Sequence, residues 1–229
     1  MQLLAFDTST QWLTIACAHG GRWVERQERA GQAHSQRLLP LVDEVLAEAG
    51  LALVDLDAIA FGAGPGSFTG VRIGCGVAQG LAFGAGIPLV PVSTLEAIAE
   101  AAWQAHGWTR VLACLDARMR EVYVATYRRE DDGWIAEREP AVMRPQDVAA
   151  TAHAGNGAGD GFAAYPDLAS RLGLACVDAT AIPRARAIAA LAMPEVAAGR
   201  TLAASEALPV YVRHRVALTT AERDAGTRL

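Results

Sequence analysis

Residues 61–86 read FGAGPGSFTGVRIGCGVAQGLAFGAG and hold nine of the chain's 22 glycines. The stretch begins as an apolar run typical of a buried strand and continues from residue 68 as a helix. A glycine-rich turn between a strand and a helix is a common phosphate-binding arrangement. Here the P-loop pattern fails for want of a lysine, which the whole chain lacks, and the G-x-G-x-x-G spacing fails too. Pro65 also removes one backbone N–H, so the sequence argues against phosphate binding at this turn.

The helix predicted over residues 68–83 carries small residues in two rows at four-residue spacing. The first row is Gly66, Gly70, Gly74, Ala78, Ala82 and Gly86, and the second is Gly76, Gly80 and Gly84. Each glycine inside a helix costs about 0.5–1 kcal/mol relative to alanine. Close approach by another element can offset that cost. Two compatible interpretations remain open: tight packing on the chain's own sheet, and a helix–helix interface with a partner chain.

Outward from this stretch, the hydrophobic pattern predicts an α/β protein in two related halves. In the first half, strands are expected at 2–6, 12–18, 22–29, 56–64 and 87–93, with helices at 35–49, 68–83 and 94–103. The pattern restarts near residue 106, with strands at 110–117, 120–129, 133–142 and 168–179 and helices at 144–152 and 185–198. Each half therefore opens with an antiparallel three-strand meander. The expected domains are 1–105 and 106–215, with helix 185–198 able to pack back on the first half, followed by a loose tail at 216–229.

Composition excludes several classes of function. A net charge of −5 argues against unaided binding to nucleic acid. The four cysteines are scattered without a C-x-x-C pair, and no histidines stand at metal-ligand spacing, so no metal site is expected. The N-terminus lacks signal-peptide features and no uninterrupted apolar run reaches about 18 residues, so the chain is expected to be cytoplasmic, with no membrane partner.

Five segments, in order over roughly residues 1–215, resemble one protein family. They are FDTST, AFGAGPGSFTGVRIG, LVPVSTLEA, LDARMREVYVATY and PVYVR. Together they are similar to the TsaB (YeaZ) family, which acts in forming N6-threonylcarbamoyladenosine in bacterial tRNA. The resemblance implies two actin-like (ribonuclease H-like) subdomains, each a mixed sheet flanked by helices. It also implies a heterodimer with the catalytic paralogue TsaD, contact with the small ATPase TsaE, and a homodimer when the chain is alone. In that assembly a threonylcarbamoyl group moves to adenosine 37 of tRNAs reading codons that begin with A, and tRNA is met only through the complex.

Comparison with the catalytic paralogue predicts that this chain has no catalytic residues and no metal. TsaD-type proteins carry an HxEGH-like motif, and the aligned residues here run from Thr94 to Ile98, so both histidine positions are lost. The two loops at the phosphate positions of an actin-like ATPase, DTST and residues 116–121, lack glycine. No cofactor is therefore expected. A vestigial nucleotide cleft with weak affinity would involve residues of the first loop and of the later glycine-rich loop: Asp7, Thr8, Ser9, Gly157 and Gly159.

The sequence thus predicts a non-catalytic scaffold and activator that docks its paralogue through helices 68–83 and 35–49. The residues expected at that interface are Leu38, Val42, Phe68, Gly70, Val71, Gly74, Cys75 and Ala78. The alternative is a nucleotide-dependent enzyme that uses its own actin-like cleft. An older protease label for the family has no support, since Ser67 and Ser93 lack a neighbouring histidine and the sequence offers neither a metal pair nor an activated nucleophile.

Overall fold

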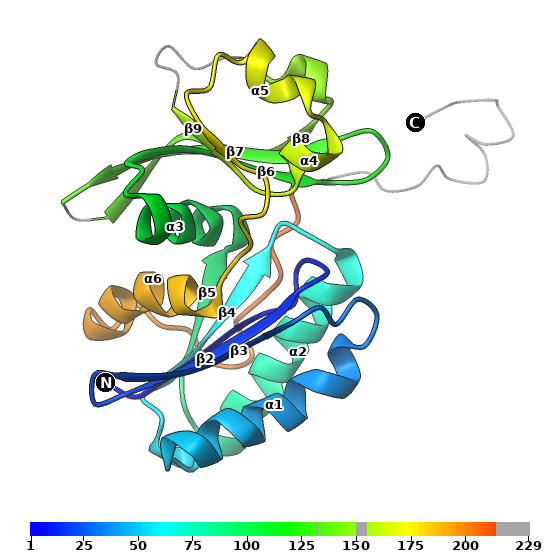
Figure 1. Cartoon of the computed structure of the whole chain (residues 1–229). Coiled ribbons are helices and arrows are strands. Elements are labelled where there is room, and N and C mark those ends of the chain that lie inside the picture. Colours follow the sequence, from blue (N-terminus) through cyan, green and yellow to red (C-terminus); the bar gives the residue numbers. More distant parts are fainter. Residues whose placement is uncertain (132, 150–154, 214–229) are drawn as a thin grey trace, which may run out of the picture.

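The computed structural model describes residues 1–131, 133–149 and 155–213, which form two five-stranded sheets with helices on their faces (Figure 1). The first sheet has the order β3-β2-β1-β4-β5. Its strands are β1 (Leu3–Asp7), β2 (Leu13–His19), β3 (Arg22–Glu28), β4 (Ala58–Gly64) and β5 (Leu89–Ser93). β1 to β3 pair antiparallel, and β4 pairs parallel to both β1 and β5. β1 and β4 are buried throughout because helices cover both faces of this sheet.

The second sheet repeats this topology. Its order is β10-β9-β6-β7-β8, so the meander again stands on one side of the first strand and the parallel strands on the other. The strands are β6 (Arg110–Asp116), β7 (Val122–Glu130), β8 (Gly133–Met143), β9 (Asn156–Ala158) and β10 (Val177–Asp178). Two mixed sheets, each opening with a three-strand meander, are what the sequence predicts.

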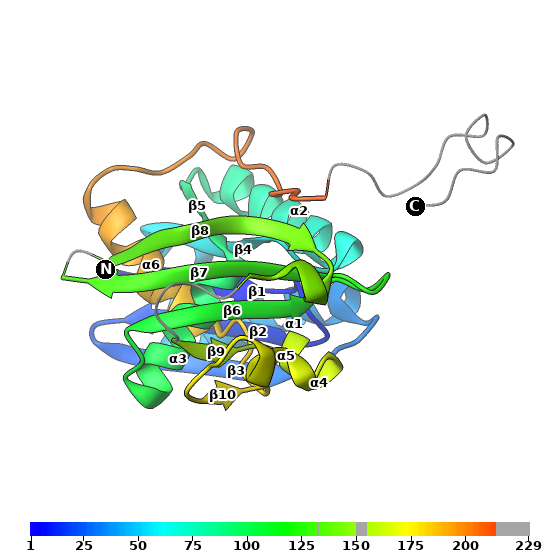
Figure 2. The ribbon, with the colours of Figure 1, turned by 90° about the horizontal axis from the view of Figure 1, so that it is seen from above.

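Four long helices form the layers around the sheets. α1 (His34–Ala49) and α2 (Phe68–Ala85) lie side by side on the outer face of the first sheet, and α6 (Ala185–Ala197) covers its other face (Figures 1 and 2). α3 (Thr94–His106) lies between α6 and the second sheet. The short helices are η1 (Leu53–Asp55), η2 (Pro145–Asp147), α4 (Gly161–Ala164) and α5 (Asp167–Arg171). Among the described residues, no helix has both the length and the apolar character needed to span a membrane.

The long helices match their predicted ranges within two or three residues, but the second half differs from the prediction after residue 143. Among the described residues, the helix expected at 144–152 is only η2, and β9 lies in the stretch expected to be a glycine-rich loop. Residues 168–179, expected as one strand, form most of α5, a turn and the two-residue β10. After α6 the chain runs back along the first sheet, where Leu202 exchanges two backbone hydrogen bonds with Leu89. Val210 N–H then donates to the Ala63 carbonyl at 2.8 Å. The predicted tail at 216–229 lies outside the described residues.

Candidate functional site

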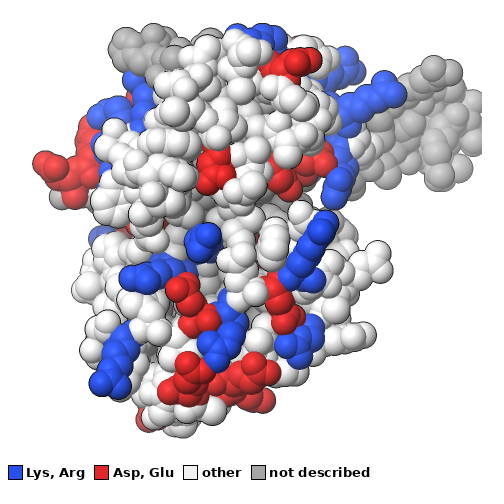
Figure 3. Space-filling view, viewed as in Figure 1, with Lys and Arg blue, Asp and Glu red and all other residues white. Residues whose placement is uncertain are grey.

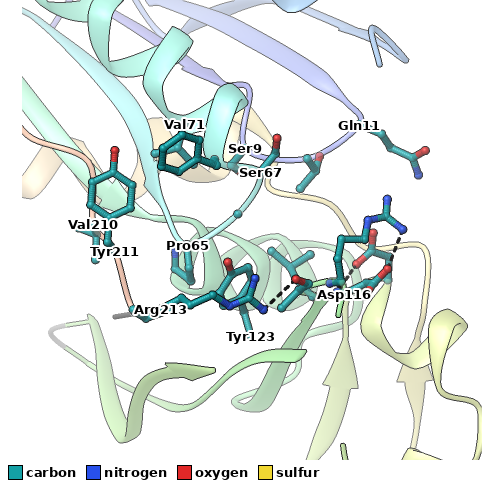
Figure 4. Close-up of a pocket in the computed structure, with 18 of the residues that line it drawn as sticks. Ser9, Gln11, Pro65, Ser67, Val71, Asp116, Tyr123, Val210, Tyr211 and Arg213 are labelled. Carbon is teal, nitrogen blue, oxygen red and sulfur yellow. Dashed lines mark hydrogen bonds and ion pairs between the residues drawn. The ribbon is translucent and has the colours of Figure 1, made fainter. Parts of the chain in front are cut away.

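A cavity of about 790 Å³ lies between the two halves (Figure 4). Most of its lining comes from five segments: the β1–β2 turn, the start of α2, the β6–β7 loop, the loop at Asp160, and the last described residues of the chain, 210–213. In an actin-like fold, the β1–β2 turn and the β6–β7 loop are the places where phosphates would be held. The cavity is therefore the place to test the predicted vestigial cleft.

Most polar side chains at the start of the β1–β2 turn point into the protein, away from the cavity. Asp7, Thr8 and Ser9 are at most 1% exposed, and of the three only Ser9 lines the cavity. One Asp7 oxygen, Oδ1, accepts hydrogen bonds from Ser9 N–H and Oγ, both at 2.8 Å, while Oδ2 has no partner in the described structure. Burial raises the pKa of Asp7 to about 7. The expectation that Asp7 and Thr8 face a cleft is therefore corrected: both are sealed beneath the turn.

The start of α2 is packed against this turn. A Cβ added at Gly70 would lie 2.0 Å from the Thr8 carbonyl oxygen, and one at Gly66 would lie 2.4 Å from the Ser9 carbonyl oxygen. Ser67 N–H already donates to the Ser9 carbonyl at 2.7 Å, and Gly70 N–H faces the Ser67 hydroxyl at 3.4 Å. Two N–H groups that a phosphate would use are thus engaged within the chain. The argument from sequence against a phosphate cradle agrees with this geometry.

The β6–β7 loop forms the opposite wall with an unusual backbone. The φ values of Arg118, Met119 and Arg120 are 59°, 52° and 62°, a left-handed backbone conformation that residues other than glycine rarely adopt. Asp116 stabilises the turn, because its Oδ1 accepts from Arg118 N–H at 2.9 Å and its Oδ2 pairs with the Arg118 guanidinium at 2.8 Å. The sequence Arg-Met-Arg carries no signal for this conformation. Backbone strain of this kind is typical of functional sites.

The later glycine-rich loop contributes a carboxylate and not its glycines. A Cβ at Gly157 would lie 2.6 Å from the Phe162 ring, and one at Gly159 would lie 2.2 Å from the Cys114 carbonyl oxygen. Neither glycine lines the cavity, so this part of the predicted cleft is also corrected: both serve close packing on β6 and α4. Asp160 lines the cavity instead and accepts a hydrogen bond from Asp116 N–H at 3.0 Å. Burial raises the pKa of Asp160 above its usual range.

The end of the described chain completes the mouth of the cavity, and sequence reasoning did not find its residues. Arg72 of α2 stacks over Phe68 at 3.7 Å and donates from Nε to the Tyr211 hydroxyl at 2.8 Å. Arg213 donates to the Ala117 carbonyl at 3.0 Å and so ties this segment to the β6–β7 loop. The only signal was the PVYVR segment, whose distance in sequence hides its contact with α2. No histidine or cysteine is among the described residues that line the cavity.

The residues aligned with the paralogue's metal ligands do not suit a metal. Thr94 and Ile98 are both fully buried at the start of α3, and an isoleucine side chain has no ligand atom. Across the described residues, no group of three or more His, Cys, Asp or Glu side chains could hold a metal ion. The donor set at this position therefore does not fit the metal that the paralogue's motif implies.

The predicted docking residues divide into a buried set and an exposed one. Seven of the eight are buried inside the chain: Leu38, Val42, Gly70, Val71, Gly74, Cys75 and Ala78. They pack against the first sheet and its β1–β2 turn, so they cannot form a docking surface on this fold, and that prediction is corrected. Only Phe68 is exposed, at 52%, and it stands at the mouth of the cavity.

The second glycine row of α2 faces outward. Nothing lies within 4 Å of a Cβ built at Gly76, Gly80 or Gly84. Phe83 beside this row is 84% exposed, and Leu39 on α1 is 47% exposed. We call these five residues the outer face. Figure 3 shows acidic side chains gathered along α1 at the foot of the molecule, where the exposed ones are Asp43, Glu44 and Glu48.

Known proteins resemble this chain over nearly its whole length. A family model described as TsaD, tRNA N6-adenosine threonylcarbamoyltransferase, matches residues 26–209. The tRNA threonylcarbamoyladenosine biosynthesis protein TsaB of Escherichia coli strain K12 is 43% identical, over 95% of this chain and 96% of the relative. TsaB of Haemophilus influenzae is 41% identical, over 94% of this chain and 95% of the relative.

A solved structure agrees with these sequence matches. YeaZ from Pseudomonas aeruginosa superposes with a TM-score of 0.85 at 41% identity, covering 92% of this chain and 99% of that one. With the strand order repeated in the two sheets, this match confirms the predicted fold of two actin-like subdomains.

Proposed function

The chain belongs to the TsaB (YeaZ) family, and on that premise we propose that it acts in N6-threonylcarbamoyladenosine formation as a scaffold subunit without a catalytic step of its own. The relatives' names give the pathway, tRNA threonylcarbamoyladenosine biosynthesis. The more specific role rests on the residues of this chain.

The make-up of the two candidate reaction sites supports a non-catalytic role. Thr94 and Ile98 stand where the catalytic paralogue has paired histidines, and both are buried. In the interdomain cavity, Asp7 is sealed away, and the start of α2 is occupied by its contacts with the β1–β2 turn. A subunit with this construction contributes through what it binds.

The outer face is the surface that we assign to the partner. Phe83 at 84% exposure is the single observation that carries this assignment, because covering a large apolar side chain that is so open to water with another surface is favourable. Gly76, Gly80 and Gly84 beside it would let a second helix approach closely, since they put no side chain between the two backbones.

We propose the TsaD-type catalytic paralogue as the partner, with the small ATPase TsaE joining the pair and tRNA reached only through the complex. A second copy of this chain would use the same face when the paralogue is absent. The exposed carboxylates of α1 disfavour that homodimer, because a two-fold interface brings like charges together, and they favour a partner with a basic counterpart.

Co-purification with the TsaD-type paralogue tests the assignment. Phe83→Glu places a charge in the centre of the outer face and should abolish the complex, while circular dichroism and the unfolding midpoint stay unchanged because the side chain contacts solvent. Ile135→Glu is the matched control, since Ile135 is 42% exposed on β8 of the other half. Retention of the paralogue by Phe83→Glu would show that the docking surface lies elsewhere.

A second candidate, a nucleotide-dependent enzyme, has one observation in its favour. The cavity of about 790 Å³ stands where this fold holds a nucleotide, and Arg72, Arg118 and Arg213 line it. Asp116 and Asp160 line it too, and their carboxylates oppose a phosphate that arrives without a cation. Calorimetry with ATP and Mg²⁺ on the isolated chain decides between the two proposals. Micromolar affinity with turnover would favour the enzyme, and no binding or turnover would favour the scaffold.

A further inference from the structure

A second hollow, of about 1300 Å³, opens on the chain between β3, α3, β8 and α6, and it shares no lining residue with the interdomain cavity. Three of the chain's five tryptophans line it, Trp23 from β3, Trp103 from α3 and Trp134 from β8. We call this hollow the tryptophan groove. The two halves of the molecule both contribute to it, since β3 belongs to the first sheet and β8 to the second.

One end of the tryptophan groove already holds a cation from the chain itself. The Arg129 guanidinium lies 3.6 Å from the ring centre of Trp103 and 5.4 Å from that of Trp134. It forms an ion pair with Glu100 at 2.5 Å, and Trp134 Nε1–H donates to the same Glu100 oxygen at 2.8 Å. Aromatic faces and a buried carboxylate thus combine here into a seat for a guanidinium group.

The groove continues past this seat to a carboxylate that has no cation. Glu96 lies one helical turn before Glu100 on α3 and lines the same groove. Among the described residues, no side chain forms an ion pair or a hydrogen bond with the Glu96 carboxylate. Burial raises the pKa of Glu96 to about 7, together with the negative charges of Glu100, Glu195 and Glu139.

Some of the other charged groups that line the groove are ion-paired, and others are not. Glu195 of α6 is paired with Arg200 at 2.7 Å, and Glu100 with Arg129. Arg186 lies over the Trp23 ring at 5.1 Å, at the wall formed by β3 and the start of α6, and Arg184 lines the groove beside it. No arginine is among the charges that act on Glu96. The lining charges without an ion pair among the described residues are three carboxylates and two arginines, Glu25, Glu96, Asp131, Arg184 and Arg186, so the unpaired charge of the groove is negative on balance.

We propose that the tryptophan groove binds an organic cation, an alkylammonium or guanidinium group, with Glu96 as its counter-ion and the tryptophan rings as its walls. The way Arg129 is held shows the mode of contact, and Glu96 offers a second place for it. Such a cation has two possible sources, a free polyamine or an arginine or lysine side chain of a partner protein. This inference does not depend on the role proposed for the outer face.

Tryptophan fluorescence of the full-length chain gives a direct readout, because the rings that would report binding line the site. Two probes are titrated at an ionic strength fixed with sodium chloride: spermidine, and the tripeptide acetyl-Gly-Arg-Gly-amide. We expect a saturable change in fluorescence with at least one of them. Glu96→Gln should weaken that binding by about tenfold or more, the effect of losing one charge-assisted contact.

Glu44→Gln is the matched control, because Glu44 is exposed on α1 and its substitution changes the net charge by the same amount. Binding should be unchanged in this variant. Glu96→Gln removes repulsion between carboxylates, so it should fold, and circular dichroism verifies that it does. A response to spermidine alone identifies a free polyamine as the source, and a response to the tripeptide identifies a basic side chain. No saturable response to either probe, or equal affinity in Glu96→Gln and the wild-type chain, overturns the proposal.

Discussion

The two glycine rows of α2 have the same spacing and opposite surroundings. The inner row, Gly66, Gly70 and Gly74, meets Thr8 and Ser9 so closely that a Cβ would lie 2.0 to 2.6 Å from their atoms. The outer row, Gly76, Gly80 and Gly84, has nothing within 4 Å of a Cβ position and is exposed. One helix therefore uses glycine for two different purposes on two of its faces.

The difference teaches that a stripe of small residues has no meaning until its surroundings are known. The inner glycines are needed by this chain's own fold, since the β1–β2 turn occupies the space of their missing side chains. Within the described chain nothing compensates for the outer ones, each of which costs about 0.5–1 kcal/mol of helix stability. A cost without a contact inside the chain is what a surface for a partner would leave behind.

Gly70→Ala is the change with the largest expected effect. The new methyl group would lie 2.0 Å from the Thr8 carbonyl oxygen, which is backbone and cannot swing aside, so the β1–β2 turn must move. We expect a loss of more than about 4 kcal/mol of stability, in the range of severe core disruption. Urea unfolding followed by circular dichroism measures it.

Gly76→Ala is the control for this prediction, because it adds the same methyl group to the same helix on the open face. It should fold at least as well as the wild-type chain. Similar unfolding midpoints for the two variants would mean that the two rows do not differ in the way described.

Asp7→Asn tests whether the Asp7 carboxyl is buried away from water beneath the β1–β2 turn. Asp7 lies beneath the inner row, where a Cβ at Gly62 would lie 1.8 Å from its Oδ2, and its pKa is raised from 3.8 to about 7 by burial. A carboxyl with a raised pKa favours folding at low pH, and this contribution is lost as the pH rises from about 4 to 7. Between pH 5 and pH 8 the wild-type chain should lose about 2 to 3 kcal/mol from this group, two units at 1.36 kcal/mol each being the core of that loss.

The asparagine variant keeps the acceptor for Ser9 and carries no charge, so its stability relative to the wild-type chain should rise by that amount between pH 5 and pH 8. Urea unfolding at the two pH values gives the difference, in which other titrating groups cancel. Asp43→Asn on the exposed surface of α1 should show no such change. If the stability difference between Asp7→Asn and the wild-type chain did not change with pH, the Asp7 carboxyl would ionise at little cost and would not be shielded from water.

Sequence periodicity was enough for the layers of the fold but not for the roles of the two glycine rows. The apolar positions of α1 and α2 gave both helices within two residues, and the repeated meander gave the two halves. The phase of a row relative to the sheet depends on how the helix is rotated, and both rows fit the same pattern. The prediction therefore assigned the inward residues to the partner.

Long-range contacts explain what else the sequence could not give. Tyr211 and Arg213 reach the cavity from the far end of the chain, and nothing in their neighbourhood in sequence indicates α2 or the β6–β7 loop as their contacts. The residue types of the left-handed turn at Arg118 favour ordinary backbone, and the loop is likewise held by distant residues: Asp116 N–H donates to Asp160, and the Ala117 carbonyl accepts from Arg213. Local patterns give elements; contacts between distant segments decide which side chains meet.

Gly80→Ala has the smallest expected effect and separates the chain from its assembly. In the isolated chain the added methyl group enters open space and favours the helix, so stability should rise by about 0.5–1 kcal/mol. If a partner helix packs against the outer face, the same methyl group lies between two backbones and should weaken the complex with the paralogue. The stability measured by urea unfolding of the isolated chain should therefore rise, while the affinity measured by titration with the TsaD-type protein should fall.

Ala47→Gly is the control, because Ala47 is exposed on α1 and the change lowers helix stability, which calibrates the size of the glycine effect. Gly199→Ala is not suitable, since φ at Gly199 is +69° and a side chain there would be strained. A rise in stability with unchanged binding would contradict the assignment of the outer row to a partner helix.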